Sequence, residues 1–468
     1  MPRAHRARFL QNVKDILAQA WPVLVSSWAS IAYGVMDTAM AGHSSASDLQ
    51  AMALAVSIYI TVFIGLMGAV HALIPILAQH YGARRFHHVG RSWGQGVWLA
   101  LALSVVGTVA LAFPGVWLSL SGQLGPEVRH SVTWYLRALI VALPAALIFR
   151  SIYCLGTAVS RPKVVMMINL ASVAFKLLFN WIFIFGHFGM PGLGATGAGV
   201  STALVSWLTM TAGLWIIYHD QYFARFRLRI RRPRLKDQLE LLRLGIPMGA
   251  SYLIEVAAFT FMALLIAREG MYITGGHQIM SNLAALCYMM PMAVGIASAS
   301  LTAQAIGAQN LSKARDMGRA GISIVIVGAV LTSAMLIAGR STILNVYTDD
   351  LQVAVVAATL LQLLPFFHIA DAMQCISSYL LRAYKVAVIP LLLLITALTG
   401  VGLLGGWWLG FGPAAGTLEP LIERVMPGAP IGAATMWMMA FSGLGLSACL
   451  LFAWYAHVVR IHAQRQGG

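Results

Sequence analysis

Three acidic residues, Asp37, Glu255 and Asp371, each interrupt a long apolar run in a chain that holds only 15 Asp and Glu among its 468 residues. A carboxylate at the depth of a lipid bilayer costs roughly 2.5 to 3.5 kcal/mol, so such residues are kept where they have a function. Reversible binding of a cation is the chemistry that these carboxylates offer. For Glu255 and Asp371 the alternative is a structural salt bridge to an intramembrane base such as Arg150 or Lys176.

Polar residues recur at three- and four-residue spacing in the run that contains Asp37 and in two later runs. Each set therefore shares one face of a helix. Lys176 is the natural counter-charge for Asp37. The polar faces either line a cavity or bond across helices merely to hold them together, at about 0.6 kcal/mol each. The sets are Ser30, Tyr33, Asp37 and Met40; Ser172, Lys176 and Asn180; and Thr202, Ser206 and Thr209.

The acids of the second half have similar surroundings. Glu255 shares a helix face with Ser251 and Tyr252, which supply oxygen atoms that suit a hard monovalent cation. Two carboxylates that meet in a low-dielectric site repel each other until a cation or a proton intervenes. The pair could titrate or bind Na⁺, and the residues alone do not choose. The face of Asp371 holds His368, Gln374 and Ser378, and His368 is interpreted as a satisfied interior histidine.

The elements that position these residues are membrane helices. Hydrophobic residues make up 59% of the chain and charged residues 10%, which predicts an all-α integral membrane protein with twelve spans and no sizeable soluble domain. The predicted spans are 18–41, 51–79, 94–120, 131–159, 164–187, 193–218, 245–266, 275–305, 318–338, 351–381, 387–409 and 431–459.

The 31 Lys and Arg are distributed unevenly among the connections. If the N-terminus is cytoplasmic, most of them fall at the two termini and in the connections on that same side, which the positive-inside rule predicts to be the cytoplasm. The other side holds only Arg129, Arg268, Arg340 and Arg424. We therefore expect a multi-pass protein of the inner membrane with both termini cytoplasmic.

The densest basic run, from Phe226 to Asp237, divides the two groups of six spans. The predicted organisation is an N-lobe (1–218), a basic cytoplasmic linker (219–244) and a C-lobe (245–468). The run is either a solvated connector or a patch for nucleic acid or anionic lipid, and the connector is the preferred interpretation. We expect membrane lipids and no nucleic acid as partners, and a monomer.

The two halves repeat each other. One shift without a gap lays Pro22 on Pro247 and Ser26 on Ser251. Because each half holds an even number of spans, the copies share one orientation and are parallel repeats. The same shift superimposes Ala78-Gln79 on Ala303-Gln304 and Gly82-Ala83 on Gly307-Ala308.

Several long strings resemble the multidrug and toxic compound extrusion (MATE) family, in particular its NorM-like branch, in the order in which that family carries them. They are MDTAMAGHSSASDLQAMAL (36–54), LAQHYGARR (77–85), NWIFIFGHFGMPGLGATGAG (180–199), VYTDD (346–350) and DAMQCISSYLLRAYK (371–385). The resemblance covers almost the whole chain. It implies a twelve-helix, V-shaped protein of two six-helix lobes that exchanges Na⁺ or H⁺ for organic, mostly cationic, drugs.

The resemblance also implies residue roles. Glu255 and Asp371 correspond to the cation site of the C-lobe, which would bind Na⁺ in a sodium-coupled protein, and Asp37 to an N-lobe acid tied to protons or substrate. Asn180, Thr202 and Lys176 are expected to support Asp37. The positions that match substrate contacts near the outer mouth are Ser57, Gln278, Asp349 and Asp350.

The chain lacks the HExxH, P-loop and GxSxG motifs, so we expect no enzyme and no cofactor besides the transported ion. The string from Gly192 to Gly197 fits GxGxxG, but no strand precedes it, and close helix packing explains it better. The alternative function is a flippase for lipid-linked oligosaccharides or polysaccharides of related fold, which would need a cationic cavity.

Overall fold

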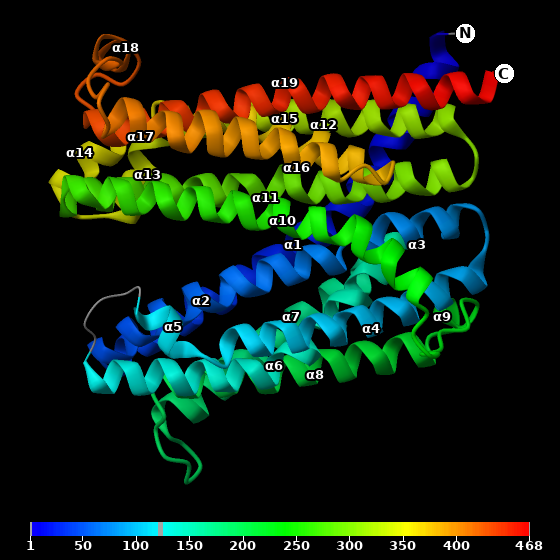
Figure 1. Cartoon of the computed structure of the whole chain (residues 1–468), viewed down its shortest axis with the longest axis horizontal. Coiled ribbons are helices and arrows are strands. Elements are labelled where there is room, and N and C mark those ends of the chain that lie inside the picture. The colour runs from blue at the N-terminus through cyan, green and yellow to red at the C-terminus, as the bar shows by residue number, and fades with distance from the viewer. Residues whose placement is uncertain (1, 120–124, 468) are drawn as a thin grey trace. The chain divides into compact units, whose positions relative to one another are not determined.

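The computed structural model describes residues 2–119 and 125–467, and the regular elements within these ranges are all helices (Figure 1). Eleven helical stretches there are long and apolar enough to cross a membrane, and one bent pair raises the number to twelve. The predicted all-α membrane fold is confirmed.

The first half of the chain contains α1 (Pro2–Ser44), α2 (Ala46–Val70), α3 (Leu73–Gly82), α4 (Phe86–Leu111), α5 (Pro114–Ser119), α6 (Pro126–Ala158), α7 (Pro162–Phe185), α8 (Ala195–His219), α9 (Gln221–Ala224) and α10 (Leu235–Ile266). The second half contains η1 (Ala267–Glu269), α11 (Met271–Gly307), α12 (Leu311–Ala338), α13 (Arg340–Tyr347), α14 (Leu351–Leu360), α15 (Leu364–Ala383), α16 (Val388–Leu394), η2 (Ile395–Leu404, a π-helix), α17 (Gly405–Gly410), α18 (Glu419–Val425) and α19 (Ile431–Gly467).

Predicted spans 351–381 and 94–120 differ from the structure, and span 51–79 is divided into α2 and α3. The run 351–381 is not one helix, because α14 and α15 are bent by 52° at the residues between them. Pro365 lies in the first turn of α15, where its missing N–H removes no helical hydrogen bond, so a new helix can begin there. The run 94–120 ends early, because α4 stops at Leu111 and Pro114 starts α5; residue 120 lies outside the described residues.

The chain divides into two compact units. The N-terminal unit comprises Trp21–Tyr252, and the C-terminal unit comprises the chain from Leu253 onward together with the segment up to Ala20. The chain passes from one unit to the other inside α1 and inside α10. Each of these helices contains an internal proline, Pro22 or Pro247, and these are the two prolines that the internal repeat superimposes.

Each unit has its own apolar core. In the N-terminal unit, α6 packs against α2, α4 and α8, and Leu136, Leu139 and Leu143 are fully buried at its centre. In the C-terminal unit, α15 lies alongside α11, α12 and α19 (Figure 1). There the buried rings of Phe367 and Trp437 meet edge to face, with centroids 5.2 Å apart. The helix that carries Asp371, α15, is therefore held by well-packed neighbours.

Candidate functional site

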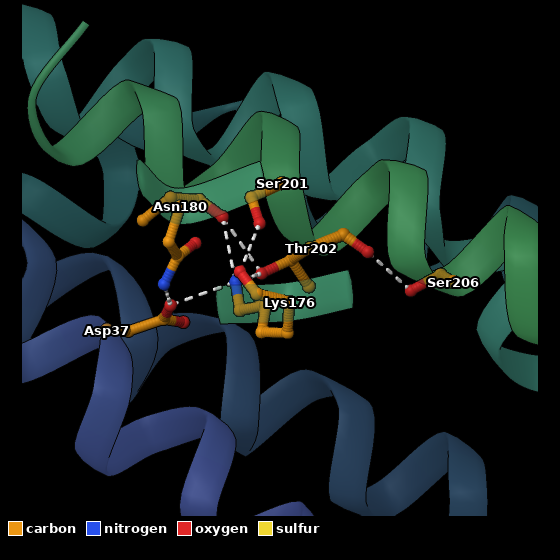
Figure 2. Close-up of polar contacts among 7 residues, drawn as sticks. Asp37, Lys176, Asn180, Ser201, Thr202 and Ser206 are labelled. Carbon is orange, nitrogen blue, oxygen red and sulfur yellow. Dashed lines mark hydrogen bonds and ion pairs between the residues drawn. The ribbon is translucent and has the colours of Figure 1, made fainter. Parts of the chain in front are cut away.

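Polar side chains from three helices meet in the N-terminal unit. The Lys176 ammonium lies 2.9 Å from Asp37 Oδ1, and the Asn180 side-chain amide donates to the same oxygen at 2.6 Å. Lys176 also donates to the Thr202 hydroxyl at 2.7 Å and to the Ala198 carbonyl at 3.2 Å. Figure 2 shows how Asp37 of α1 faces the two residues of α7, with Thr202 of α8 on the other side of the ammonium. The predicted pairing of Lys176 with Asp37 is confirmed.

This cluster is buried and only partly satisfied. Lys176 is 1% exposed and Asp37 is 6% exposed. An ammonium has three N–H donors, and the three acceptors around Lys176 use all of them. Among the described residues, both contacts of Asp37 go to Oδ1, and the Asn180 Oδ1 atom is buried without a hydrogen-bond partner. The Asp37 Oδ2 and Asn180 Oδ1 atoms are therefore left to accept a proton, a water molecule or a cationic ligand.

Most hydroxyls of the predicted polar stripes bond to their own helices. Ser30, Ser206 and Thr209 each donate to a backbone carbonyl three or four residues earlier. Two contacts do join helices: the hydroxyls of Tyr33 and Ser172 bond to each other between α1 and α7, and Thr202 of α8 accepts from Lys176 of α7. The hydrogen bonds that Ser30, Ser206 and Thr209 make among the described residues therefore do not join helices, and the cavity-lining role of the polar faces stays a prediction.

In the C-terminal unit the two acids are not locked to a base. Glu255 on α10 accepts a hydrogen bond from Gln374 Nε2 of α15 at 3.1 Å. Asp371, also on α15, is close enough for its charge to interact with that of Glu255. Neither carboxylate forms an ion pair with a base among the described residues, although the Arg382 charge acts on Glu255 at longer range. Both acids are half-buried.

The carboxylate of Asp371 has no hydrogen bond to a described residue, and the charge of Glu255 that acts on it has the same sign. Like charges in a low-dielectric site repel, and a monovalent cation or a proton between them removes the repulsion. The described residues contain no group of three or more His, Cys, Asp and Glu that could hold a metal ion. A cation here would therefore be held by two carboxylates and neutral oxygen atoms.

The interpretation of His368 as a satisfied interior histidine is wrong. The residue is 1% exposed, as an interior position requires, but neither ring nitrogen has a hydrogen-bond partner among the described residues. The reason is its surroundings: Leu364 and Phe367 of the same helix belong to the apolar core of the unit. His368 lies one turn before Asp371.

The four residues predicted near an outer mouth are all exposed: Ser57, Gln278, Asp349 and Asp350. Ser57 donates to a carbonyl oxygen one turn earlier in its own helix, at 2.8 Å. Asp350 accepts backbone N–H groups of the first turn of α14, the shorter bond being 2.9 Å from Gln352. Asp350 thus has a structural task as the helix cap. The role of these four residues in substrate binding stays a prediction.

Two further acids were not found by sequence reasoning. Asp48 of α2 accepts the backbone N–H of Ala195 at the start of α8, at 2.9 Å. In the C-terminal unit, Glu269 accepts the N–H groups of Gly432 (3.0 Å) and Ala433 (2.7 Å) at the start of α19. In each unit a remote carboxylate therefore caps the N-terminus of a long helix, where negative charge is favourable.

A glycine makes room for each carboxylate. A Cβ atom on Gly194 would lie 2.4 Å from the Asp48 oxygens, and one on Gly432 would lie 2.4 Å from Glu269 Oε1. The absence of a Ser, Thr, Asn or Asp cap at these two starts is the signal that points to a remote cap. Close packing also explains the rest of the glycine-rich string, because a Cβ on Gly197 would lie 2.3 Å from the Phe183 carbonyl oxygen.

Removing either cap should destabilise the protein without changing ion coupling. We expect Asp48→Ala and Glu269→Ala each to lower the free energy of unfolding by about 1 kcal/mol, and Asp48→Asn and Glu269→Gln, which keep an acceptor oxygen, to lower it by less. Unfolding in detergent micelles with increasing dodecyl sulfate measures this. Alanine variants that unfold at the wild-type midpoint would contradict the capping role.

A comparison with known families matches the model described as MatE to residues 22–182 and again to residues 247–408. The two matched segments start at the prolines that the internal repeat superimposes, and together they contain Asp37, Lys176, Asn180, Glu255 and Asp371.

Curated relatives and solved structures agree with this match. A probable multidrug resistance protein NorM of Aromatoleum aromaticum is 38% identical over 84% of this chain and 85% of its own. One of Chromobacterium violaceum is 31% identical over 100% of this chain and 98% of its own. Two crystal structures share the fold. That of the eukaryotic MATE transporter AtDTX14 has a TM-score of 0.85 and 21% sequence identity, and the match covers 98% of this chain and 99% of that one. That of the Vibrio cholerae MATE transporter VcmN in the bent form has a TM-score of 0.83 and 15% identity, and the match covers 97% of this chain and 98% of that one.

Proposed function

Because the chain belongs to the MatE family of multi-span membrane transporters, we propose that it exports organic, mostly cationic, compounds in exchange for Na⁺ or H⁺. The protein is a secondary transporter of the inner membrane, with both termini in the cytoplasm. It acts as a monomer and uses no cofactor other than the transported ion.

The observation that carries the proposal is the unpaired state of Glu255 and Asp371. Two carboxylates within interaction range, half-buried in membrane helices and without an ion pair to a described base, attract a monovalent cation. Gln374 orients Glu255 and leaves the rest of its lone pairs open. Such a pair takes up one ion and releases it when its surroundings change, which is the task of a coupling site.

The N-terminal cluster has a different part in the cycle. Asp37 is already neutralised by Lys176, so a cation that approaches it must displace the ammonium or use the remaining Oδ2 atom. We assign Asp37 to binding of the organic cation or a proton, with Lys176, Asn180 and Thr202 holding it in place. A flippase for phosphorylated lipid carriers is not favoured, because the charge of Lys176 is used internally and offers little to an anionic headgroup.

The free energy stored in the ion gradient can offset the cost of moving the drug against its concentration gradient. Since a tenfold concentration gradient of one ion stores about 1.4 kcal/mol, one ion entering for each monovalent drug cation leaving sustains at most about a tenfold drug gradient. Equal charges move in opposite directions, so the membrane potential neither helps nor hinders this one-to-one cycle.

Transport in proteoliposomes tests the proposal. With purified protein we expect an imposed Na⁺ gradient or an imposed pH gradient to drive a fluorescent monovalent organic cation uphill, and a matching ionophore to abolish the accumulation. Protein-free vesicles serve as the control. If neither gradient moves any of a panel of organic cations against its concentration, the antiporter proposal is wrong.

A further inference from the structure

A basic cavity lies in the N-terminal unit, away from the acidic residues discussed so far. It has a volume of about 550 Å³ and is formed between the first turns of α4 and the segment that follows α9. In Figure 1 this segment returns from α9 beside α4. Its polar lining consists of His87, His88 and Arg91 on one side and Arg227, Arg229 and Arg231 on the other.

The wall that carries the three arginines is fixed to α4. A Cβ atom on Gly90 would lie 2.1 Å from the Phe226 carbonyl oxygen, and one on Gly94 would lie 2.6 Å from that of Arg229. The glycines of α4 therefore allow the backbone of the segment to lie directly against the helix. The backbone of the basic run is thus held against α4, while its basic side chains are exposed, and its role as a solvated connector stays a prediction.

Side chains of α4 reinforce this contact. Trp98 donates to the Arg231 carbonyl at 2.7 Å, and Gln95 donates to the Arg232 carbonyl at 3.1 Å. Gln95 in turn accepts the backbone N–H of Arg234 at 2.9 Å. Because its backbone is held at Arg231, Arg232 and Arg234, the segment presents its side chains from a fixed position.

The cavity is positively charged without local compensation. Arg227, Arg229 and Arg231 belong to a non-helical segment, and all three line the cavity. None of the three forms an ion pair with a described residue, and no acidic residue lines the cavity. Arg91 is neutralised by Asp237, at 2.9 Å. The remaining three guanidinium groups repel one another unless an anion lies between them.

The start of α4 adds to this positive field. The helix N-terminus carries roughly half a positive charge on its free N–H groups. The first turn of α4 contains no acidic residue, and its N-cap, Arg85, makes no side-chain cap hydrogen bond. The helix dipole would therefore stabilise an anion in the cavity, in addition to the stabilisation by the arginines.

The location selects the kind of anion. Two membrane spans begin beside the cavity, one at Phe86 and one at Leu235. Ile230 and Leu235, next to the arginine wall, are 48% and 76% exposed and suit the edge of a lipid layer. We propose that the cavity binds the phosphate group of an anionic phospholipid from the adjacent leaflet, with Arg227, Arg229 and Arg231 as its ligands.

The chain supplies a matched control for a test. Arg227→Gln/Arg229→Gln/Arg231→Gln removes the cavity arginines. Arg232→Gln/Arg234→Gln/Lys236→Gln removes three exposed charges of the same linker that do not line the cavity. Both triple variants lose the same net charge, so a general attraction to anionic lipid falls equally in both. A specific site is lost in the first variant alone.

Native mass spectrometry of the full-length protein, titrated with phosphatidylglycerol or phosphatidylcholine in a neutral detergent, provides the measurement. We expect the wild type and the control triple variant to bind the first phosphatidylglycerol at least about tenfold more tightly than phosphatidylcholine, and the cavity variant to lose this preference. The single variant Arg229→Gln, which perturbs the fold less than a triple substitution does, should weaken phosphatidylglycerol binding about fivefold.

Equal weakening in both triple variants, or none in the cavity variants, would overturn the site. A separate arm tests the source of the phosphate group with glycerol 3-phosphate. If this soluble probe displaces phosphatidylglycerol from the wild type at equal concentration, the cavity is a site for free phosphate compounds and the lipid assignment is wrong. No displacement supports the lipid.

Discussion

Replacing Lys176 with Met should destabilise the protein by about 3 to 5 kcal/mol, because it leaves Asp37 as an uncompensated charge among packed helices. The two residues are almost fully buried and 2.9 Å apart, and methionine keeps most of the volume of the lysine side chain. The loss is therefore electrostatic rather than a loss of packing. Unfolding of the purified variant in detergent micelles gives the difference in free energy.

A double variant distinguishes the effect of losing one charge of the pair from the effect of losing both. In Asp37→Asn/Lys176→Met both charges are gone and Asn180 keeps a partner, so we expect most of the lost stability to return. Transport should not return, because the proposed role of Asp37 needs its charge. If the double variant is as unstable as Lys176→Met alone, the pair does not hold the helices in the way that its geometry indicates.

The N-terminal cluster was predictable because helical spacing is a local property. Lys176 and Asn180 lie four residues apart and must share one face of α7. Asp37 is the main acidic residue in the first half of the chain that this face can contact. The chain's low content of charge left few alternative partners. For the same reason the membrane helices and the internal repeat were visible in the sequence.

The caps that remote segments provide could not be predicted. The caps that Asp48 and Glu269 provide depend on how a loop approaches the start of a helix far along the chain, and no periodicity records that approach. The break before α15 was missed because the apolar run 351–381 continues through it, and Pro365 in the first turn of the new helix is its one local signal. His368 was misjudged because the pattern cannot show which neighbours a buried ring meets.

Glu255→Gln and Asp371→Asn should each abolish uphill transport of an organic cation while leaving the fold intact. The substitutions keep the size of each side chain and remove one of the two charges that would hold the ion. Glu255→Gln can still accept from Gln374. A tenfold ion gradient that gives the wild type up to about a tenfold drug gradient should therefore give these variants none. Accumulation in proteoliposomes under each gradient measures the effect.

Glu419→Gln is the matched control, because it makes the same chemical change at an exposed acid of the same unit and should transport as the wild type does. Downhill movement of the drug gives a second readout, since loss of coupling need not close the pathway. If either variant still accumulates drug under the gradient that drives the wild type, the ion is not held by this pair. Asp37, with its unoccupied Oδ2 atom, is then the remaining buried acid among the described residues of the spans that can couple the two fluxes.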